Sequence, residues 1–236
     1  MDFELSKEIK AIQKEARRFA RQEVMPRIRE EGFKRDLVSA MGELGLFGCA
    51  FPVKYGGSDL GFLAHSVVCE EISRADSGLR PLFNIQALTV PYTIMEWSTS
   101  TARDRYVRDL ILARKLGCTC FSEPNVGSDI ASIETCIQDK GDYFLLNGTK
   151  TWISNGTVAD LAVVYATFDG SLKHNGLCAV VVETDQADMR ALRHPSFQPR
   201  QYKGNVVSLL REGLSHSEAG HAQPPADMRR EFPSIH

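Results

Sequence analysis

Two stretches in the second half of the chain combine residue types that can hold a flat or anionic ligand. In the first, residues 121–129, Gly127 lies between hydroxyl groups at Ser122 and Ser128. A glycine lets the backbone approach a ligand closely, and neighbouring N–H and O–H donors can hold its oxygens. The alternative is a purely structural turn in which Asp129 begins a short helical turn. The pattern alone leaves both interpretations open.

The second stretch, residues 147–156, places the aromatic Trp152 two positions before the hydroxyl of Ser154. Residues two apart on a strand share one face, so this pair would present an aromatic edge and a hydroxyl together. The alternative is that Trp152 is an ordinary core residue. Asn147 and Gly148 ahead of it predict a hairpin turn. The sequence therefore predicts a hairpin followed by a strand with one side available to a ligand.

The elements that must position these stretches begin with a helical first half. Apolar residues recur in steps of three and four from Leu5 to Val24, which is one face of an amphipathic helix, and Pro26 ends it. The same periodicity predicts further helices over residues 34–44, 63–75, 91–97 and 102–113. Residues 1–115 are therefore expected to form an all-helical domain.

After residue 116 the pattern changes to short runs rich in β-branched and aromatic residues. These runs are residues 118–121, 143–146, 151–153, 161–165 and 177–182. Asn-Gly and Asp-Gly dipeptides lie between or beside them, which predicts an antiparallel sheet or a small barrel. Because helices come first and strands follow, the fold class is α+β, with an antiparallel, β-barrel-like middle domain over residues 116–188. Residues 189–236 are expected to be a divergent, weakly ordered tail in which only residues 206–210 could pack.

Composition and charge argue against several classes of protein. The 236 residues include 28 Lys+Arg and 30 Asp+Glu, a net charge of −2, which is not typical of a protein whose main role is nucleic-acid binding. No apolar run reaches the roughly 18 residues that a membrane span needs, and the N-terminus lacks the apolar core of a signal peptide. The six cysteines follow no zinc-ligand spacing, so we expect free thiols and no metal site. A cytoplasmic protein is expected, and the mitochondrial matrix stays open.

Together, the two stretches resemble the acyl-CoA dehydrogenase family. Residues 122–129 match its T/S-E-P-x-x-G-S-D motif, and residues 148–155 match its G-x-K-x-W-I-T/S-N segment. Residues 48–57 resemble the family's loop that ends in P-x-x-Y-G-G. Shorter matches resemble, more narrowly, the glutaryl-CoA dehydrogenase branch, at residues 76–80, 123–125, 133–135 and 146–152. The resemblance covers roughly residues 1–188.

The resemblance implies an FAD-dependent enzyme that removes two hydrogens from the α and β carbons of an acyl-CoA. In such enzymes a carboxylate takes the α-proton, flavin N5 takes the β-hydride, and an electron-transfer flavoprotein accepts the electrons. The residues implied for FAD binding are Thr119, Cys120, Phe121, Ser122, Gly127, Ser128, Trp152, Ile153 and Ser154. Ser128 would also touch the acyl-CoA, and full-length members form homo-oligomers.

The branch resemblance also implies a role for Arg80 in substrate binding. Arg80 matches the arginine that meets the distal carboxylate of a glutaryl-type substrate through paired donors. Pro81 follows where the branch tends to place a serine, so the acyl chain and any decarboxylation stay open. The alternative for Arg80 is an ordinary solvated loop arginine.

The chain departs from the family after about residue 188. There the family continues with further strands and a second helical domain, which supplies the catalytic glutamate, adenine-side FAD contacts and the oligomer core. Nothing in residues 189–236 resembles either part, and neither Glu123 nor Glu134 is expected to substitute for that glutamate. We therefore expect a flavin cradle with no proton-abstracting base and no C-terminal helical bundle, as in a truncated, alternatively spliced or frame-shifted product.

Three functions stay open from the sequence. The first is an FAD-dependent acyl-CoA dehydrogenase of fatty acid or amino acid catabolism, of which this chain is an N-terminal portion. The second is a catalytically inactive fragment or isoform that retains flavin, acyl-CoA or subunit binding. The third is a flavin monooxygenase built on the same fold, which would consume oxygen without an electron-transfer partner.

Overall fold

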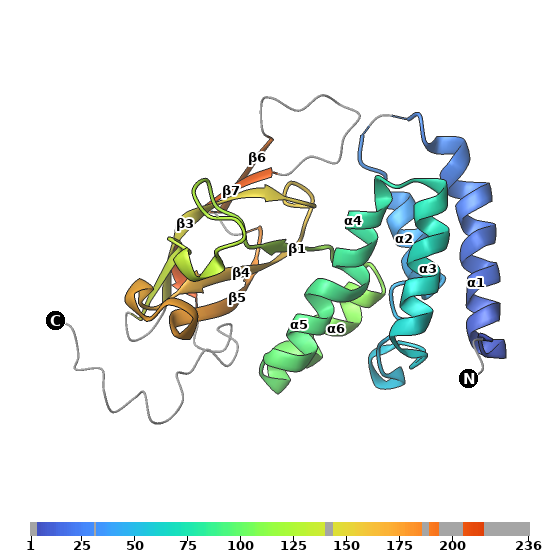
Figure 1. Ribbon diagram of the computed structural model, residues 1–236, viewed down its shortest axis with the longest axis horizontal. Coiled ribbons are helices and arrows are strands. Elements are labelled where there is room, and N and C mark those ends of the chain that lie inside the picture. Colours follow the sequence, from blue (N-terminus) through green and yellow to red (C-terminus); the bar gives the residue numbers. More distant parts are fainter. Residues whose placement is uncertain (1–3, 31, 140–143, 186–188, 194–204, 215–236) are drawn as a thin grey trace.

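The structure, a computed structural model, describes residues 4–30, 32–139, 144–185, 189–193 and 205–214. A helical unit lies beside a sheet, and β1 (Gly117–Cys120) runs from the helices into the sheet (Figure 1). The two units pack directly against each other, since Val90 and Ile94 from the helical unit share one apolar cluster with Val163 and Val181 from the sheet. The order of helices first and strands second is as predicted.

The helical unit contains the helices that the apolar periodicity predicts. The first helix, α1 (Lys7–Phe19), continues through a π turn η1 (Ala20–Val24) and a 3-10 turn η2 (Met25–Arg27), so it runs slightly past Pro26. The remaining helical segments are α2 (Arg35–Glu43), η3 (Val53–Tyr55), α3 (Gly61–Ala75), α4 (Leu79–Asn84), η4 (Ile85–Thr89), α5 (Val90–Trp97) and α6 (Ser100–Ile111). No helix in the described part of the chain is long and apolar enough to cross a membrane.

The helical run ahead of Pro91 is longer than predicted. The sequence predicted a helix only after Pro91, whereas α4, η4 and α5 follow one another without a break. Proline has no N–H to donate into the preceding turn and its ring needs extra room there. The π turn η4, which directly precedes α5, is a local widening of the helix that accommodates this proline.

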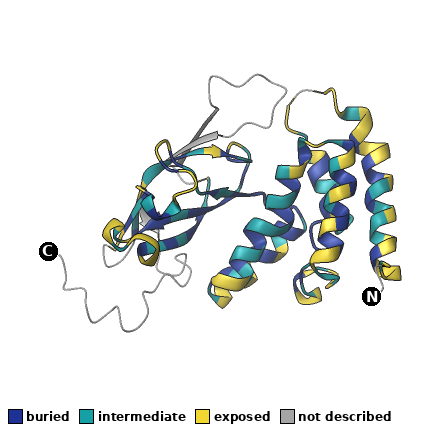
Figure 2. Cartoon of the chain, viewed as in Figure 1, coloured by how far each residue is buried: buried dark blue, intermediate teal, exposed yellow. Residues whose placement is uncertain are grey.

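Buried residues line the faces between the helices and along the sheet, while exposed residues cover the outer sides (Figure 2). Phe47 and Phe83 pack together in the helical core with ring centroids 5.3 Å apart. An ion pair joins α1 to α3: Arg17 donates two hydrogen bonds, of 2.7 and 2.9 Å, to the buried carboxylate of Glu71. Gln13 donates a third, of 3.2 Å, so both oxygens of this carboxylate are hydrogen-bonded.

The sheet domain is a mixed sheet. Its other strands are β2 (Cys136–Asp139), β3 (Phe144–Ile153), β4 (Leu161–Thr167), β5 (Leu177–Glu183), β6 (Met189–Arg193) and β7 (Asn205–Leu214), with the 3-10 turns η5 (Ile130–Ser132) and η6 (Gly170–Gly176) between strands. In space the strands run β1-β4-β2-β3-β7-β6, with β5 paired to β4.

The prediction of an antiparallel, barrel-like domain is wrong. β4 pairs in parallel with β1 and with β2, and the described strands do not close into a barrel. The parallel pair forms because the chain returns to the start of β1 before β4 begins: the N–H groups of Asp160 and Leu161 both donate to the carbonyl of Leu116. Strand-forming residue types show that strands exist, but long-range returns of this kind set their direction.

Asn147 and Gly148 do not form the predicted hairpin turn, because both lie within β3. Position 148 has no room for a side chain, because a Cβ on Gly148 would lie 2.2 Å from Oγ1 of Thr135 on the neighbouring segment. A close approach between two backbones, and not a turn, therefore accounts for this glycine.

Two strands, β6 and β7, lie in the segment predicted to be a weakly ordered tail. β6 pairs with β7, and β7 pairs along β3, both in antiparallel register. β7 includes residues 206–210, the run expected to pack. Residues 194–204 and 215–236 lie outside the described residues, so weak order there stays a prediction.

Candidate functional site

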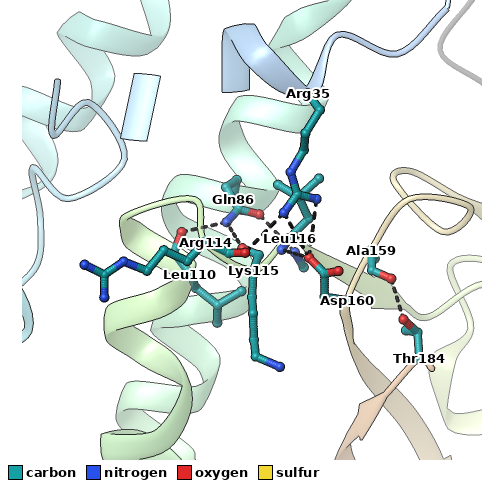
Figure 3. Close-up of polar contacts among 10 residues, drawn as sticks. Arg35, Gln86, Leu110, Arg114, Lys115, Leu116, Ala159, Asp160 and Thr184 are labelled. Atoms are coloured by element: carbon teal, nitrogen blue, oxygen red, sulfur yellow. Dashed lines mark hydrogen bonds and ion pairs between the residues drawn. The ribbon is translucent and has the colours of Figure 1, made fainter. Parts of the chain in front are cut away.

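A buried amide fixes the point where the helical unit leads into β1. Gln86 of η4 is fully buried, and its Nε2 donates to the carbonyls of Leu110 (2.6 Å) and Lys115 (2.8 Å) (Figure 3). Its Oε1 accepts from the N–H of Gly117, at 2.9 Å. Gly117 must be small, since a Cβ there would lie 2.7 Å from Cγ1 of Val90. One side chain therefore sets the distance between α6 and the first strand.

A carboxylate fastens the start of β4 to the same junction. Asp160 accepts from the N–H of Leu116 at 2.7 Å and from Nη2 of Arg35 at 3.3 Å (Figure 3). Arg35, from α2, also donates to the carbonyl of Arg114, at 3.1 Å. The ends of β1 and β4 nearest the helices are thus held by side chains from both units.

Successive residues of β1 point to opposite faces of the sheet. Cys118 and Cys120 point into the apolar cluster inside the sheet domain, with their Sγ atoms 3.8 Å apart. Of the residues predicted to bind a cofactor, Cys120 can therefore offer only its backbone. Ile153 is buried in the same cluster and is likewise a packing residue.

Thr119 and Phe121 point the other way, toward the helical unit. Thr119 is in register with Val163, which belongs to the cluster shared with the helices. The Phe121 ring stacks on Tyr165 of β4, with centroids 3.7 Å apart and planes at 17°. Burial raises the pKa of Tyr165, although a hydrogen bond involving Thr93 of α5 opposes that shift. An aromatic pair and a hydroxyl therefore lie on the sheet face that meets α5.

The end of β3 runs beside β1 in the opposite direction. The N–H of Thr151 donates to the carbonyl of Ser122 (2.8 Å), and Nδ2 of Asn155 donates to the carbonyl of Gly117 (3.1 Å). This pairing brings the two stretches singled out in the sequence into direct contact. Trp152 and Ser154 lie one residue to either side of the buried Ile153, and Trp152 directly follows the residue that bonds to Ser122.

Trp152 departs from ordinary strand geometry. Its φ is +61°, and its side chain is 51% exposed, so it is not the core residue that the alternative interpretation proposed. A left-handed backbone at a non-glycine residue costs of order 1 kcal/mol or more, and such strain is concentrated at functional sites. β3 also carries a register irregularity between Lys150 and Ile153, which frees this segment from regular pairing.

Two hydroxyl groups at this position lack partners. Oγ1 of Thr119 and Oγ1 of Thr151 are buried and make no hydrogen bond within the part of the chain that the structure describes. Buried hydroxyls are nearly always hydrogen-bonded, so both of these are unusual. Atoms of this chain cover both hydroxyls, as they also cover the unpaired Oγ1 of Thr135, so these groups reflect local packing and are not open to a ligand.

An ion pair whose two side chains are both buried holds the turn that follows Phe121. Nζ of Lys150 lies 2.7 Å from Oε1 of Glu123, and both side chains are essentially inaccessible, at 0% and 1%. The same carboxylate accepts from the N–H groups of Glu134 (2.6 Å) and Thr135 (3.0 Å). Lys150 also donates to the carbonyl of Phe121, at 3.2 Å.

The surroundings of Glu123 make it a structural carboxylate. Burial opposes its charge, but the hydrogen bonds from Lys150 and from the backbone of Glu134 and Thr135 outweigh burial and hold the pKa of Glu123 below its ordinary value. Burial lowers the pKa of Lys150, although the carboxylate opposes that shift. A carboxylate whose lone pairs are used in this way is a poor proton acceptor.

The remaining predicted site residues lie at the surface. Gly127 and Ser128 are exposed, and a methyl group added at Gly127 would meet no described atom within 4 Å. Asp129 directly precedes η5 and accepts from the hydroxyl of Ser132 (2.6 Å), as the structural alternative predicted. Arg80 is exposed on α4, some distance along the chain from β1.

Four residues of this site were not singled out from the sequence: Gln86, Lys150, Thr151 and Tyr165. Lys150 and Thr151 lie inside the second motif, so their position in it was a usable indication. Gln86 and Tyr165 carry no local pattern, and only the fold brings them to β1. No group of three or more His, Cys, Asp or Glu side chains among the described residues could hold a metal ion.

Two family models match the chain. The acyl-CoA dehydrogenase N-terminal domain matches residues 6–113, and the acyl-CoA dehydrogenase middle domain matches residues 118–200. Among curated proteins, the glutaryl-CoA dehydrogenase of Desulfococcus multivorans is 42% identical over 224 residues, which cover 92% of this chain and 54% of that protein. The mitochondrial isovaleryl-CoA dehydrogenase of Bos taurus is 36% identical over 171 residues, covering 70% and 40%. The chain thus spans about half the length of these relatives.

Solved structures of acyl-CoA dehydrogenases share the fold of this chain. A glutaryl-coenzyme A dehydrogenase in complex with glutaryl-CoA superposes with a TM-score of 0.89 at 34% identity, over 93% of this chain and 58% of that one. A glutaryl-CoA dehydrogenase from Mycobacterium smegmatis in complex with FADH2 gives 0.82 at 25% identity, over 91% and 55%. The two consecutive domain matches, the shared fold and the motifs that meet at β1 and β3 lead to one conclusion: the chain belongs to the acyl-CoA dehydrogenase family.

Proposed function

We propose that this chain forms the flavin-binding part of an FAD-dependent acyl-CoA dehydrogenase whose substrate is a glutaryl-CoA-like acyl-CoA. The observation that carries the proposal is the contact between the two motifs: the N–H of Thr151 donates to the carbonyl of Ser122, and the next residue, Trp152, is 51% exposed in a left-handed conformation. A flavin ring is flat and carries several hydrogen-bonding heteroatoms, so an exposed indole and the partly exposed hydroxyls of Ser122 and Ser154 fit it.

The residues proposed to hold FAD are Thr119, Cys120, Phe121, Ser122, Gly127, Ser128, Trp152, Ile153 and Ser154. Because Cys120 and Ile153 point into the sheet core, their contribution would come from the backbone. The open space around Gly127 leaves room for a bound group to approach the turn. When bound, FAD supplies the hydride-accepting chemistry of the dehydrogenation, and the protein positions it and excludes water.

Substrate binding is proposed for Ser128 and Arg80. Both are exposed, so they are accessible to a ligand arriving from solvent. The guanidinium of Arg80 would pair with a distal carboxylate through two parallel donors, which suits a dicarboxylic acyl chain. The relatives named glutaryl-CoA dehydrogenase support this choice, while the isovaleryl-CoA dehydrogenase shows that the family also includes other substrates.

No described residue is proposed as the α-proton acceptor. Glu123 is committed to Lys150 and to two backbone N–H groups, and the exposed Glu134 pairs with Nδ2 of Asn125 at 3.3 Å. This occupancy favours the second candidate function, a chain that binds flavin, acyl-CoA or partner subunits without turnover. The monooxygenase alternative is not favoured, because the curated relatives named above are dehydrogenases.

An electron-transfer flavoprotein and further copies of the chain are the proposed protein partners. One solved structure with a TM-score of 0.87 and 26% identity is described as an electron transferring flavoprotein of Acidaminococcus fermentans. An electron acceptor is required in any case, since each dehydrogenation leaves two electrons on the cofactor.

An FAD titration of the full chain tests the cofactor proposal. Ser122→Ala and Ser154→Ala remove one partly exposed hydroxyl each, and each is expected to raise the Kd for FAD about three- to tenfold, the usual worth of one hydrogen bond. Ser100→Ala, at an exposed position of α6, is the matched control and should leave Kd unchanged. Equal Kd values for all variants, or no FAD binding by the parent chain, would contradict the proposal. Bleaching of the bound flavin by glutaryl-CoA then separates an active chain from one that only binds.

A further inference from the structure

The buried pair of Glu123 and Lys150 connects three separate segments of the chain. Lys150 belongs to β3, Glu123 to the turn after β1, and the N–H groups of Glu134 and Thr135 to the segment before β2. The ammonium also donates to the carbonyl of Phe121, so it holds the turn at two points. The two side chains therefore form one connection, called the joint below, at the place where residues 121–122 meet residues 151–152.

Each of these contacts fixes backbone and not merely side chains. The carboxylate accepts from two backbone N–H groups, and the ammonium donates to a backbone carbonyl. Directly beside the joint, the N–H of Thr151 donates to the carbonyl of Ser122, at 2.8 Å. The next residue, Trp152, holds its left-handed conformation. The joint thus sets the relative position of the two segments that carry Phe121, Thr151 and Trp152.

A buried ion pair is a poor choice if stability alone is needed. Removing two charges from water is so unfavourable that a well-packed apolar pair is often equally stable or more so. Buried charges instead fix the positions of their partners, because each charge must be met by specific groups at hydrogen-bond distance. Both members of this pair are inaccessible to water, the carboxylate accepts three hydrogen bonds and the ammonium donates two, which is the arrangement expected of a pair that fixes geometry.

We propose that Glu123 and Lys150 are positioning residues that hold the Phe121–Ser122 turn against the Thr151–Trp152 segment and so set the geometry of the flavin-side surface. This inference rests on the proposed function for its ligand, but the placement of the segments can be measured without any cofactor. Glu123 and Lys150 act only through the segments that they join.

The test compares charge removal here with charge removal in the helical unit. Glu123→Gln together with Lys150→Met keeps the size of both side chains but leaves one oxygen, which can accept from either Glu134 or Thr135, since their N–H groups bond to different carboxylate oxygens. The double substitution also removes the donor to Phe121. The matched control is Glu71→Gln with Arg17→Met, which removes a buried carboxylate and its arginine from the α1–α3 contact. The single Glu123→Gln variant keeps the Lys150 donor and provides a milder change that is expected to fold.

With cofactor, the expected difference is in affinity and in the flavin spectrum. In the full chain, E123Q/K150M should raise the Kd for FAD by about tenfold or more, as small displacements of a binding group do, while E71Q/R17M leaves it within about twofold. The vibronic structure of the visible flavin band should change in the first variant only. Equal affinity and an unchanged band in E123Q/K150M, at a melting temperature matched to the control, would overturn the inference.

Without cofactor, amide hydrogen exchange gives an independent result. The N–H of Thr151 should exchange faster in E123Q/K150M than in the parent, and by a smaller factor in E123Q, while amides in the middle of β4 are unaffected. If the parent chain does not bind FAD, the proposed function fails, and this exchange pattern still decides whether the pair positions the two segments. Unchanged Thr151 exchange in both variants would refute the positioning role whatever the outcome with FAD.

Discussion

The helical unit and the sheet each contain a buried carboxylate paired with a cation, and the two pairs differ in what surrounds the cation. Glu71 is 2% exposed, but its partner Arg17 is 42% exposed on the surface of α1. Glu123 and Lys150 are 1% and 0% exposed. Arg17 can therefore return to water when its partner is lost, whereas Lys150 cannot, so the sheet pair is the more constrained of the two.

The partners of the two carboxylates differ in kind as well. Glu71 accepts from side chains only, Arg17 and Gln13 of α1, so it joins two helices that also pack through apolar faces. Glu123 accepts from two backbone N–H groups of an irregular segment. The helical pair adds to a contact that the hydrophobic core already determines, while the sheet pair determines a backbone path that no regular pairing specifies.

The largest expected effect is the loss of the cation from the sheet pair. Lys150→Met leaves the carboxylate of Glu123 buried with no counter-charge, which should lower the free energy of unfolding by about 3–5 kcal/mol. Arg17→Met should have a clearly smaller effect, because water can reach the Glu71 contact from the surface of α1. Urea denaturation of the two variants under the same conditions measures the difference. Equal losses would mean that burial does not distinguish the pairs.

An intermediate effect is expected at the junction between the two regions. Gln86→Leu retains the volume of the side chain but leaves the N–H of Gly117 and the carbonyls of Leu110 and Lys115 without their partner. Unpaired buried backbone groups cost about 1–3 kcal/mol, so this variant should unfold at lower denaturant concentration. Gln86→Glu should also be destabilising, because a carboxylate cannot donate to the carbonyls of Leu110 and Lys115. A Gln86→Leu protein as stable as the parent would show that the two regions are joined by apolar packing alone.

The smallest expected effect concerns the close approach at β3. Gly148→Ala places a Cβ 2.2 Å from Oγ1 of Thr135, so the strand must shift, at a cost of about 1 kcal/mol, the lower end for overpacking. Gly170→Ala is the control, because its Cβ would meet no described atom within 4 Å. The melting temperatures of the two variants measure this difference in stability. Equal melting temperatures would argue that the Thr135 segment moves freely, against the account of a fixed turn.

The sequence predicted the two regions unequally well, for physical reasons. Helices such as α2, α3 and α6 follow from apolar steps of three and four, which are local. The parallel pairing of β4 with β1 depends on hydrogen bonds between residues 116 and 160–161, a contact that no short window contains. Asn147 and Gly148 were misinterpreted as a turn because the same dipeptide serves a close backbone approach here.

The candidate site was predictable to the extent that it lies within the two motifs. The two motifs lie in contact, since the N–H of Thr151 donates to the carbonyl of Ser122, although the strain at Trp152 could not be seen in the sequence. Tyr165 completes the aromatic pair from β4 and has no motif of its own. A residue such as Tyr165, which lies in no motif, can be identified only once the fold shows what it contacts.

The central claim, that FAD binds where the end of β3 lies beside β1, is tested most directly through Trp152. The chain has two tryptophans, so Trp97→Phe leaves Trp152 as the only indole emitter. Titration of this variant with FAD should quench the Trp152 emission almost completely and in step with binding, because the isoalloxazine ring would lie against the indole. FAD binding that leaves the Trp152 emission unchanged would place the flavin elsewhere and contradict the account.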